Sequence, residues 1–366
     1  MKKLSILLMF VVAMVAFASC GGGASKKNEA QQTEVKEAAL PVGLQLYTVR
    51  GDMEKDFKGT LQKVKELGYD GVEFAGLFGN APADVKAMCA EIGLNPISAH
   101  VPLQEMLEDI DKVIADYKAI GCEYIVVPYV TEERRPGGDK FMQMVEEIRT
   151  IGQKCKEAGL VLLYHNHDFE FAKTETGEFG LDYLYANVPA DLLQTELDEC
   201  WVKYAGQDPV EYLKKYEGRS PVVHLKDYYA SGEQKEDPYA LIGLNEGEKK
   251  ENKAFEFRPL GYGVQDVKAL MKAAKHAGSQ WLIVEQDQPS MGKTPLECVA
   301  MSLETIQAIR QECASKHAEG KKCDGDKASC DHKHGEKCSG EHKTCDGEKK
   351  EEGCDHKHSE GCDHKH

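Results

Sequence analysis

Four side chains that can bind a metal ion stand at the ends of short apolar runs in the second half of the chain. They are His165, Asp198, His224 and Glu285. Apolar runs of this length, bounded by turn signals, are typical of buried parallel strands. Two imidazoles and two carboxylates suit a divalent ion such as Mn²⁺, Zn²⁺ or Co²⁺. We therefore predict a metal site that can hold two oxygens of a sugar and polarise a carbonyl.

Other polar residues on these and neighbouring runs can serve acid–base chemistry or substrate binding. The candidates for accepting a proton are Glu285, His167 and His100. Lys226 shares the strand parity of His224, so we expect it to point into the same site and bind an oxyanion. The alternative is a surface lysine paired with Asp227. Gln45 and Glu73 end early strands, where they can contact substrate hydroxyls or form hydrogen bonds in the core.

Each proposed ligand has a simpler explanation when it is taken alone. A buried histidine is usually just hydrogen-bonded, Asp198 can cap a helix N-terminus, and Glu285 can pair with a lysine. The prediction of a metal site depends on all four residues ending consecutive strands of one barrel, because such strand ends meet at one face.

The elements that must position these residues alternate between strand and helix from residue 41 onward. The predicted strands are 42–47, 69–74, 96–101, 124–130, 160–165, 192–198, 221–226 and 281–285. The predicted helices are 52–67, 83–92, 103–120, 140–158, 181–187, 209–216, 267–277 and 295–310. A polar insertion covers roughly 228–257. Eight such units predict an α/β fold, a (β/α)8 TIM barrel. The alternative, an open doubly wound sheet, is disfavoured because no Gly-rich phosphate loop follows the first strand.

The first 40 residues have the composition of an export signal and a linker. Lys2 and Lys3 precede an apolar stretch, residues 4–17, that is too short for a stable membrane span. The following segment, Phe17 to Cys20, resembles the lipobox of bacterial lipoproteins. We expect residues 1–20 to be a lipoprotein signal, with Cys20 lipidated and anchored to the periplasmic or outer-membrane face. The alternative is an ordinary signal peptide with a chance cysteine. Residues 21–40 are predicted to be a flexible tether.

The C-terminal segment, 314–366, has a composition unlike the rest of the chain. It lacks Leu, Ile, Val, Phe, Tyr, Trp and Met, so it cannot bury enough apolar surface to fold alone. It carries six cysteines and eight of the thirteen histidines. We predict a disordered tail that binds additional metal ions loosely, because its cysteines lack the two-residue spacing of a folded zinc site. The alternative is a solvated extension without a function.

Composition excludes one class of partner. The chain has 366 residues, 41% of them hydrophobic, and a formal net charge of −16. A nucleic acid would need a basic face, so we expect none as a partner.

The five cysteines in the middle of the chain are odd in number and stand in apolar contexts, which indicates buried thiols rather than disulfides. They are Cys89, Cys122, Cys155, Cys200 and Cys298.

Residues 42–311 resemble the xylose isomerase-like barrel family, the sugar phosphate isomerases and epimerases. The matching segments, in the family's order, are residues 43–47, 71–74, 98–100, 164–167, 197–198, 205–209, 223–227, 259–263 and 284–285. In members similar to tagatose 3-epimerase the ion is held by Glu, Asp, His and Glu. The last three correspond to Asp198, His224 and Glu285. This chain has His165 at the first position, so either His165 binds the ion in its place or Glu170 reaches back to the site.

The resemblance implies a metal-dependent sugar isomerase or epimerase that acts by proton abstraction through an enediolate. Replacement of one glutamate by His165 favours one-sided proton abstraction over symmetric epimerisation. Export favours free sugars or glycosides over sugar phosphates, which are cytoplasmic. The first alternative is therefore elimination from a 3-keto-glycoside at the same site. The others are a metal-binding lipoprotein that acts through its tail and a sugar-binding barrel without catalysis. The presence of Asp198, His224 and Glu285 favours the enzyme.

Overall fold

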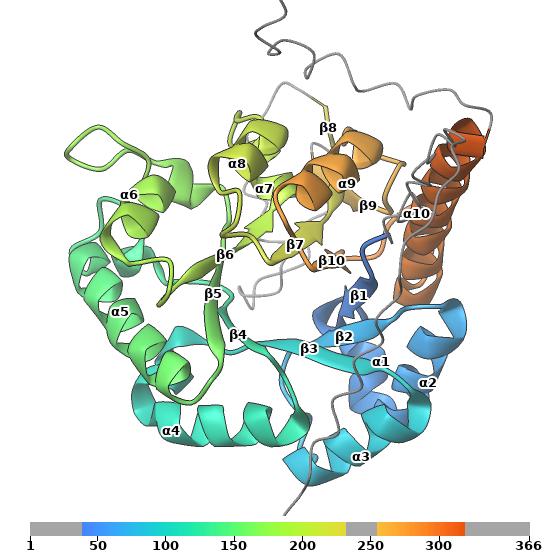
Figure 1. The fold of residues 1–366 in the computed structure, drawn as a ribbon, viewed down its shortest axis with the longest axis horizontal. Coiled ribbons are helices and arrows are strands. Elements are labelled where there is room, and N and C mark those ends of the chain that lie inside the picture. Colours follow the sequence, from blue (N-terminus) through green and yellow to red (C-terminus); the bar gives the residue numbers. More distant parts are fainter. Residues whose placement is uncertain (1–38, 232–254, 319–366) are drawn as a thin grey trace, which may run out of the picture. The chain divides into compact units, whose positions relative to one another are not determined.

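The computed structural model describes residues 39–231 and 255–318. Eight parallel strands close into a barrel in the order β1-β10-β7-β6-β5-β4-β3-β2, with helices around the outside (Figure 1). This confirms the predicted TIM barrel. The barrel strands are β1 (Val42–Gln45), β2 (Gly71–Phe74), β3 (Asn95–His100), β4 (Tyr124–Val127), β5 (Val161–His165), β6 (Gln194–Asp198), β7 (Val222–Leu225) and β10 (Trp281–Val284).

The helices follow the strands along the chain and cover the outer face of the barrel. The α-helices are α1 (Arg50–Lys55), α2 (Phe57–Leu67), α3 (Pro82–Ile92), α4 (Leu103–Ile120), α5 (Phe141–Glu157), α6 (Gly180–Asn187), α7 (Glu199–Tyr204), α8 (Pro209–Lys215), α9 (Val267–His276) and α10 (Pro295–Ala318). The short 3-10 helices are η1 (Leu46–Val49), η2 (Glu132–Arg134) and η3 (Phe169–Phe171). Their buried apolar side chains form the main core between helices and strands.

The interior of the barrel changes from apolar to polar along the strands. Its apolar layer consists of Ile97, Tyr124, Val126, Leu163, Val222 and Ile283. Gly43 and Gly71 make room for this layer, because a Cβ atom at either position would overlap the Ile97 side chain. Side chains alternate along a strand, so the next inward position after Val222 is His224 and the next after Leu163 is His165. The polar residues therefore lie at the carboxyl ends of the strands.

Three local predictions were wrong in detail. The predicted helix 52–67 is two helices, α1 and α2, because the Asp56 side chain accepts a hydrogen bond from the Gly59 amide and caps α2. The ends of the predicted polar insertion form an antiparallel pair, β8 (Asp227–Ala230) with β9 (Phe255–Arg258). Helix α10 continues to Ala318, so the predicted disordered tail from residue 314 begins within a helix.

Several predictions lie outside the described residues. These are the signal at 1–20 with Cys20, almost all of the tether at 21–40, most of the insertion, and the tail beyond residue 318. Within 39–231 and 255–318, no helix is long and apolar enough to cross a membrane. The five cysteines in the middle of the chain are buried free thiols, as predicted.

Candidate active site

The four predicted metal ligands come together at the carboxyl ends of β5, β6, β7 and β10. Each can offer one donor atom such that all four atoms lie within 4.8 Å of one another. Nδ1 of His224 is 3.1 Å from Oε2 of Glu285, and Nε2 of His165 is 3.6 Å from Oδ2 of Asp198. All four side chains are buried. We call His165, Asp198, His224 and Glu285 the outer donor set.

The outer donor set fits a divalent ion by its chemistry. Oδ1 of Asp198 caps α7 by accepting a hydrogen bond from the Trp201 amide at 3.1 Å. Oδ2 of the same carboxylate is buried and has no hydrogen-bond partner within the described residues, although the Lys226 ammonium lies 3.3 Å from it. The N-cap explanation for Asp198 therefore accounts for one oxygen only. The other oxygen faces the imidazoles and Glu285, as a metal ligand would.

Lys226 lies buried beside the outer donor set rather than at the surface. Its Nζ is 2.7 Å from Oε2 of Glu285, 2.8 Å from Oδ2 of Asp287 and 3.3 Å from Oδ2 of Asp198. Burial opposes its charge, but these three carboxylates outweigh it and hold the pKa of Lys226 well above its usual range. The alternative of a surface pair with Asp227 is wrong. The alternation of side chains along the strand correctly predicted that Lys226 points into the same site as His224.

Asp227 has a structural task instead. Its carboxylate accepts hydrogen bonds from the backbone amides of Tyr228, Gly261, Gly263 and Gln265 at 2.9 to 3.0 Å. These bonds tie the start of β8 to the segment that follows β9. The side chain is consequently turned away from Lys226, even though the two residues are adjacent in sequence.

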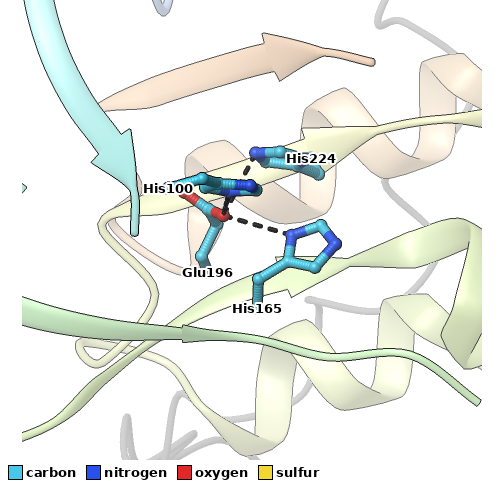
Figure 2. A group of neighbouring side chains, drawn as sticks. All are labelled: His100, His165, Glu196 and His224. Carbon is cyan, nitrogen blue, oxygen red and sulfur yellow. Dashed lines mark hydrogen bonds and ion pairs between the residues drawn. The ribbon is translucent and has the colours of Figure 1, made fainter. Parts of the chain in front are cut away.

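A second polar cluster surrounds Glu196, which lies deeper in the barrel than Asp198, two positions later on β6. The side chains of His100, His165 and His224 converge on the Glu196 carboxylate (Figure 2). Nε2 of His100 is 2.7 Å from Oε2 of Glu196 and 3.0 Å from Oε1 of Glu73. Nε2 of His224 lies between the same two oxygens, at 3.2 and 2.8 Å. Nδ1 of His165 is 3.1 Å from Oε2 of Glu196. We call His100, Glu73 and Glu196, together with these inward-facing ring nitrogens, the inner donor set.

The inner donor set also defines the roles of Gln45 and Glu73. Oε1 of Glu73 accepts a hydrogen bond from Gln45, and Oε2 accepts one from Ser98, both at 2.6 Å. Gln45 and Glu73 are fully buried and do not line the cavity described below. Of the two roles predicted for them, they therefore form hydrogen bonds in the core and do not contact the space where a substrate would bind. Burial opposes the charge of His100, but Glu73 and Glu196 raise its pKa to about 10.

His167 and Glu170 occupy the wall of the site beyond β5. The two oxygens of Glu170 accept hydrogen bonds from the Tyr164 hydroxyl and the His167 amide, both at 2.8 Å. Glu170 therefore positions the His167 loop; it does not reach back to the outer donor set or line the cavity. The His167 ring is stacked on Phe169, with centroids 5.3 Å apart. Burial and the charge of Lys226 hold the pKa of His167 well below its usual range.

A cavity of about 840 Å³ opens onto this site. Its floor includes His100, His165, His167, Lys226, Glu285 and Asp287. Its walls come from residues 75–82, the start of α4 and residues 128–134. Asp198 and His224 are fully buried behind the floor. The volume is large enough for a small organic substrate beside a bound ion.

Two residues of the site, Glu196 and Asp287, were missed by sequence reasoning. Each lies two positions from a predicted ligand, Glu196 before Asp198 and Asp287 after Glu285. Strand parity alone would have placed Glu196 in the barrel interior, as it did for Lys226. Asp287 follows β10 in a loop, where parity does not apply.

The fold agrees with comparisons to known proteins. Residues 61–311, more than half of the chain, match the sequence profile of the xylose isomerase-like TIM barrel family. The chain belongs to this family. The match begins after β1, which completes the barrel between β10 and β2.

The chain is similar in sequence to a dehydratase and similar in fold to proteins described as isomerases and epimerases. Inosose dehydratase from Geobacillus kaustophilus is 26% identical over 175 residues, which cover 42% of this chain and 56% of the relative. A sugar phosphate isomerase/epimerase from Parabacteroides distasonis is 22% identical, with a TM-score of 0.58 over 74% of this chain and 98% of that one. The IolI protein, solved with zinc bound, is 17% identical, with a TM-score of 0.56 over 75% and 99%.

Proposed function

We propose that the protein is a divalent-metal-dependent sugar isomerase or epimerase that abstracts a proton next to a carbonyl and passes through an enediolate. The observation that carries this proposal is the outer donor set, of which His165 and Glu285 line the cavity while Asp198 and His224 lie behind its floor. His165, Asp198, His224 and Glu285 would hold the ion, which we expect to be Mn²⁺, Zn²⁺ or Co²⁺. The ion would supply Lewis-acid polarisation of the substrate carbonyl.

Two side chains of the protein can take part in the reaction, one as the proton acceptor and one as a hydrogen-bond donor. The His167 ring is neutral at neutral pH and lines the cavity, so it can accept the substrate proton. The Lys226 ammonium is charged and reaches the same cavity, where it can donate a hydrogen bond to a developing oxyanion. His100 is less suited to act as the base, because its Nε2 is already in contact with Glu73 and Glu196. Glu285 is already engaged with Lys226 and His224.

Elimination of water or of a glycosidic group from a keto sugar is the second candidate function. It would use the same base and the same ion, with loss of a β-substituent after proton abstraction. The sequence relationship to inosose dehydratase favours it, as does the presence of His165 at the position where the resemblance to the epimerases predicts a glutamate. One-sided proton abstraction is sufficient for elimination, whereas symmetric epimerisation needs an acceptor on each face.

Solvent exchange separates these functions. Protein loaded with MnCl₂ is incubated in D₂O with ketoses, aldoses and 3-keto-glycosides. Deuterium at the carbon next to the carbonyl, with an isomeric product, indicates isomerisation. Loss of water or of the aglycone indicates elimination. His167→Gln should retain the ion but lose exchange, while His276→Gln, on the exposed side of α9, should behave as wild type. Absence of both exchange and elimination across the panel would contradict the enzyme proposal.

We also propose that the barrel is exported and attached to a bacterial membrane through lipid on Cys20, with further metal ions on the Cys/His tail. The support is the sequence of residues 1–20 and the composition of residues 314–366. Cys20→Ser should abolish labelling by a radioactive fatty acid and release the protein from the membrane fraction. Continued labelling of this variant would exclude Cys20 as the lipid site.

A further inference from the structure

We propose that the barrel binds a second divalent cation in the inner donor set, deeper than the ion of the outer donor set. Figure 2 shows the side chains of His100, His165 and His224 converging on the Glu196 carboxylate. One donor atom from each of these four residues lies within 4.8 Å of the others. Oε1 of Glu73 completes the cluster, 3.0 Å from His100 and 2.8 Å from His224.

The contact geometry favours a cation over a simple hydrogen-bond network. Nε2 of His100 and Nε2 of His224 each face both Glu73 and Glu196, at 2.7 to 3.2 Å. A ring N–H points along one direction, so two such groups can serve only two of these four contacts well. Donor atoms that surround one point are what a bound ion requires. In addition, Oε1 of Glu196 is buried and makes no hydrogen bond within the described residues.

The ring nitrogens are sufficient for two ions at once. A neutral imidazole has one lone pair, so it can bind only one of the two ions. His165 presents Nε2 to the outer set and Nδ1 to the inner set, whereas His224 presents Nδ1 outward and Nε2 inward. If each ring serves a different ion, the outer ion keeps three of its four possible ligands, namely Asp198, Glu285 and one imidazole. The inner ion then has His100, Glu73, Glu196 and the other imidazole.

These two ligand sets resemble the two kinds of metal site found in proteins. Three protein ligands beside a cavity leave positions open for substrate, as in catalytic sites. Four protein ligands away from solvent make a closed site, as in structural sites. Glu73, Glu196 and His224 are fully buried, and the inner set reaches the cavity through His100 and the shared His165. Because three of its ligand residues, Glu73, Glu196 and His224, are fully buried, we assign a structural role to the inner ion and the chemistry to the outer one.

The buried charge supports the same assignment. Five carboxylates have an oxygen within 3.6 Å of a nitrogen of the cluster: Glu73, Glu196, Asp198, Glu285 and Asp287. Lys226 and one divalent ion supply three positive charges, which leaves two negative charges buried. Uncompensated buried charge is costly. A second divalent ion removes the deficit; two protons shared by the imidazoles would also do so, and the experiment below separates these cases.

The test is to count and locate Mn²⁺ in the full chain. Mn²⁺ is the probe because it prefers carboxylate and imidazole over the thiols of the tail. Binding is followed by the electron paramagnetic resonance signal of free Mn²⁺, and the sites are located by anomalous diffraction. His100→Phe keeps a ring of similar shape but removes a donor that belongs to the inner set alone. Asp198→Asn is the matched outer variant. All of these chains carry the same tail, so differences in count report on the barrel.

We expect two Mn²⁺ in the barrel of the wild type and one fewer in each variant. His100→Phe should keep the anomalous peak of the outer ion, and Asp198→Asn should keep that of the inner ion. If His100→Phe binds as many ions as the wild type, the inner site is overturned while the outer site stands. If only Asp198→Asn retains the wild-type count, the outer assignment fails and the inner site stands. Should His100→Phe not fold, the wild-type map decides, because a barrel without a peak between His100, Glu73 and Glu196 excludes the inner ion.

Discussion

At the residue scale, the ammonium of Lys226 shares carboxylate oxygens with the proposed outer ion. Its Nζ contacts Oδ2 of Asp198 and Oε2 of Glu285, which are also atoms of the outer donor set. Asp287, at 2.8 Å, offers the ammonium a partner outside that set. Lys226 and the ion therefore compete for the same carboxylate oxygens. Asp287 weakens this competition because it offers the ammonium another partner.

This competition predicts opposite effects of two substitutions on metal affinity. Lys226→Met should tighten Mn²⁺ binding, because the ammonium no longer occupies the carboxylates. Asp287→Asn should weaken it, because the ammonium then depends on Glu285 and Asp198 alone. We expect a change of about tenfold in each direction, equivalent to ~1.4 kcal/mol. Isothermal titration calorimetry measures both, with Lys63→Met on the exposed face of α2 as the control. Changes of the same sign in the two variants would contradict the competition.

Glu170 predicts a pH dependence of stability. Burial raises its pKa to about 8 in the folded protein, despite the hydrogen bonds from Tyr164 and His167. Between the unfolded value of about 4.5 and about 8, the folded state holds a proton that the unfolded state has lost. The contribution of Glu170 to the free energy of unfolding is therefore full at low pH and is lost as the pH rises through this range.

Urea unfolding of the metal-free protein between about pH 5 and about pH 8 measures this loss. Glu170→Gln removes the titrating group and should flatten the decline, whereas Glu91→Gln at the exposed end of α3 should leave it unchanged. An equally steep decline in Glu170→Gln would show that other groups are responsible.

At the element scale, the strands carry the chemistry and the helices hold the strands in register. Helix α5 packs so closely on the segment before β6 that a Cβ at Gly152 would overlap the carbonyl oxygen of Leu192. This contact fixes α5 relative to the strand that carries Glu196 and Asp198. Gly51, on α1, has no neighbouring atom within 4 Å of the same position.

The two glycines predict opposite effects of alanine. Gly152→Ala should lower the free energy of unfolding by about 1–3 kcal/mol, because backbone must shift to admit the methyl group. Gly51→Ala should raise it by about 0.4–1 kcal/mol through the smaller entropy of the unfolded chain. Urea denaturation gives both values. A neutral Gly152→Ala would mean that α5 can move without cost.

At the scale of the whole molecule, closure of the barrel brings together residues from every part of its sequence. Glu73 on β2 meets His224 on β7, 151 positions later. An ion in the outer donor set would link β5, β6, β7 and β10, so it should stabilise the folded barrel as a unit.

Thermal unfolding tests this coupling. A ligand that binds only the folded state stabilises it by about 2.7 kcal/mol per site at a concentration 100 times Kd. MnCl₂ should therefore raise the Tm of the wild type, and EDTA should reverse the gain. Asp198→Asn should gain less than the wild type at the same concentration. An unchanged Tm in the wild type would contradict metal binding by the folded barrel.

The order of elements and the position of the outer donor set were predictable from the sequence. Strand–helix alternation is local, and in a barrel the carboxyl ends of the strands must meet, so His165, Asp198, His224 and Glu285 could be grouped without coordinates. The free buried cysteines and the inward direction of Lys226 followed from equally local patterns. The signal, the lipid on Cys20 and the tail beyond residue 318 stay predictions from sequence.

Only the tertiary structure decided which side chains touch across the barrel. Sequence spacing does not reveal that Glu73 and Glu196 face the same ring nitrogens, or that Asp287 rather than Asp227 binds Lys226. Neither the break at Asp56 nor the β8–β9 pair was apparent, because capping and strand pairing depend on how the chain ends meet. Periodicity along a strand fixes the direction of a side chain, whereas its partners depend on the register and closure of the whole sheet.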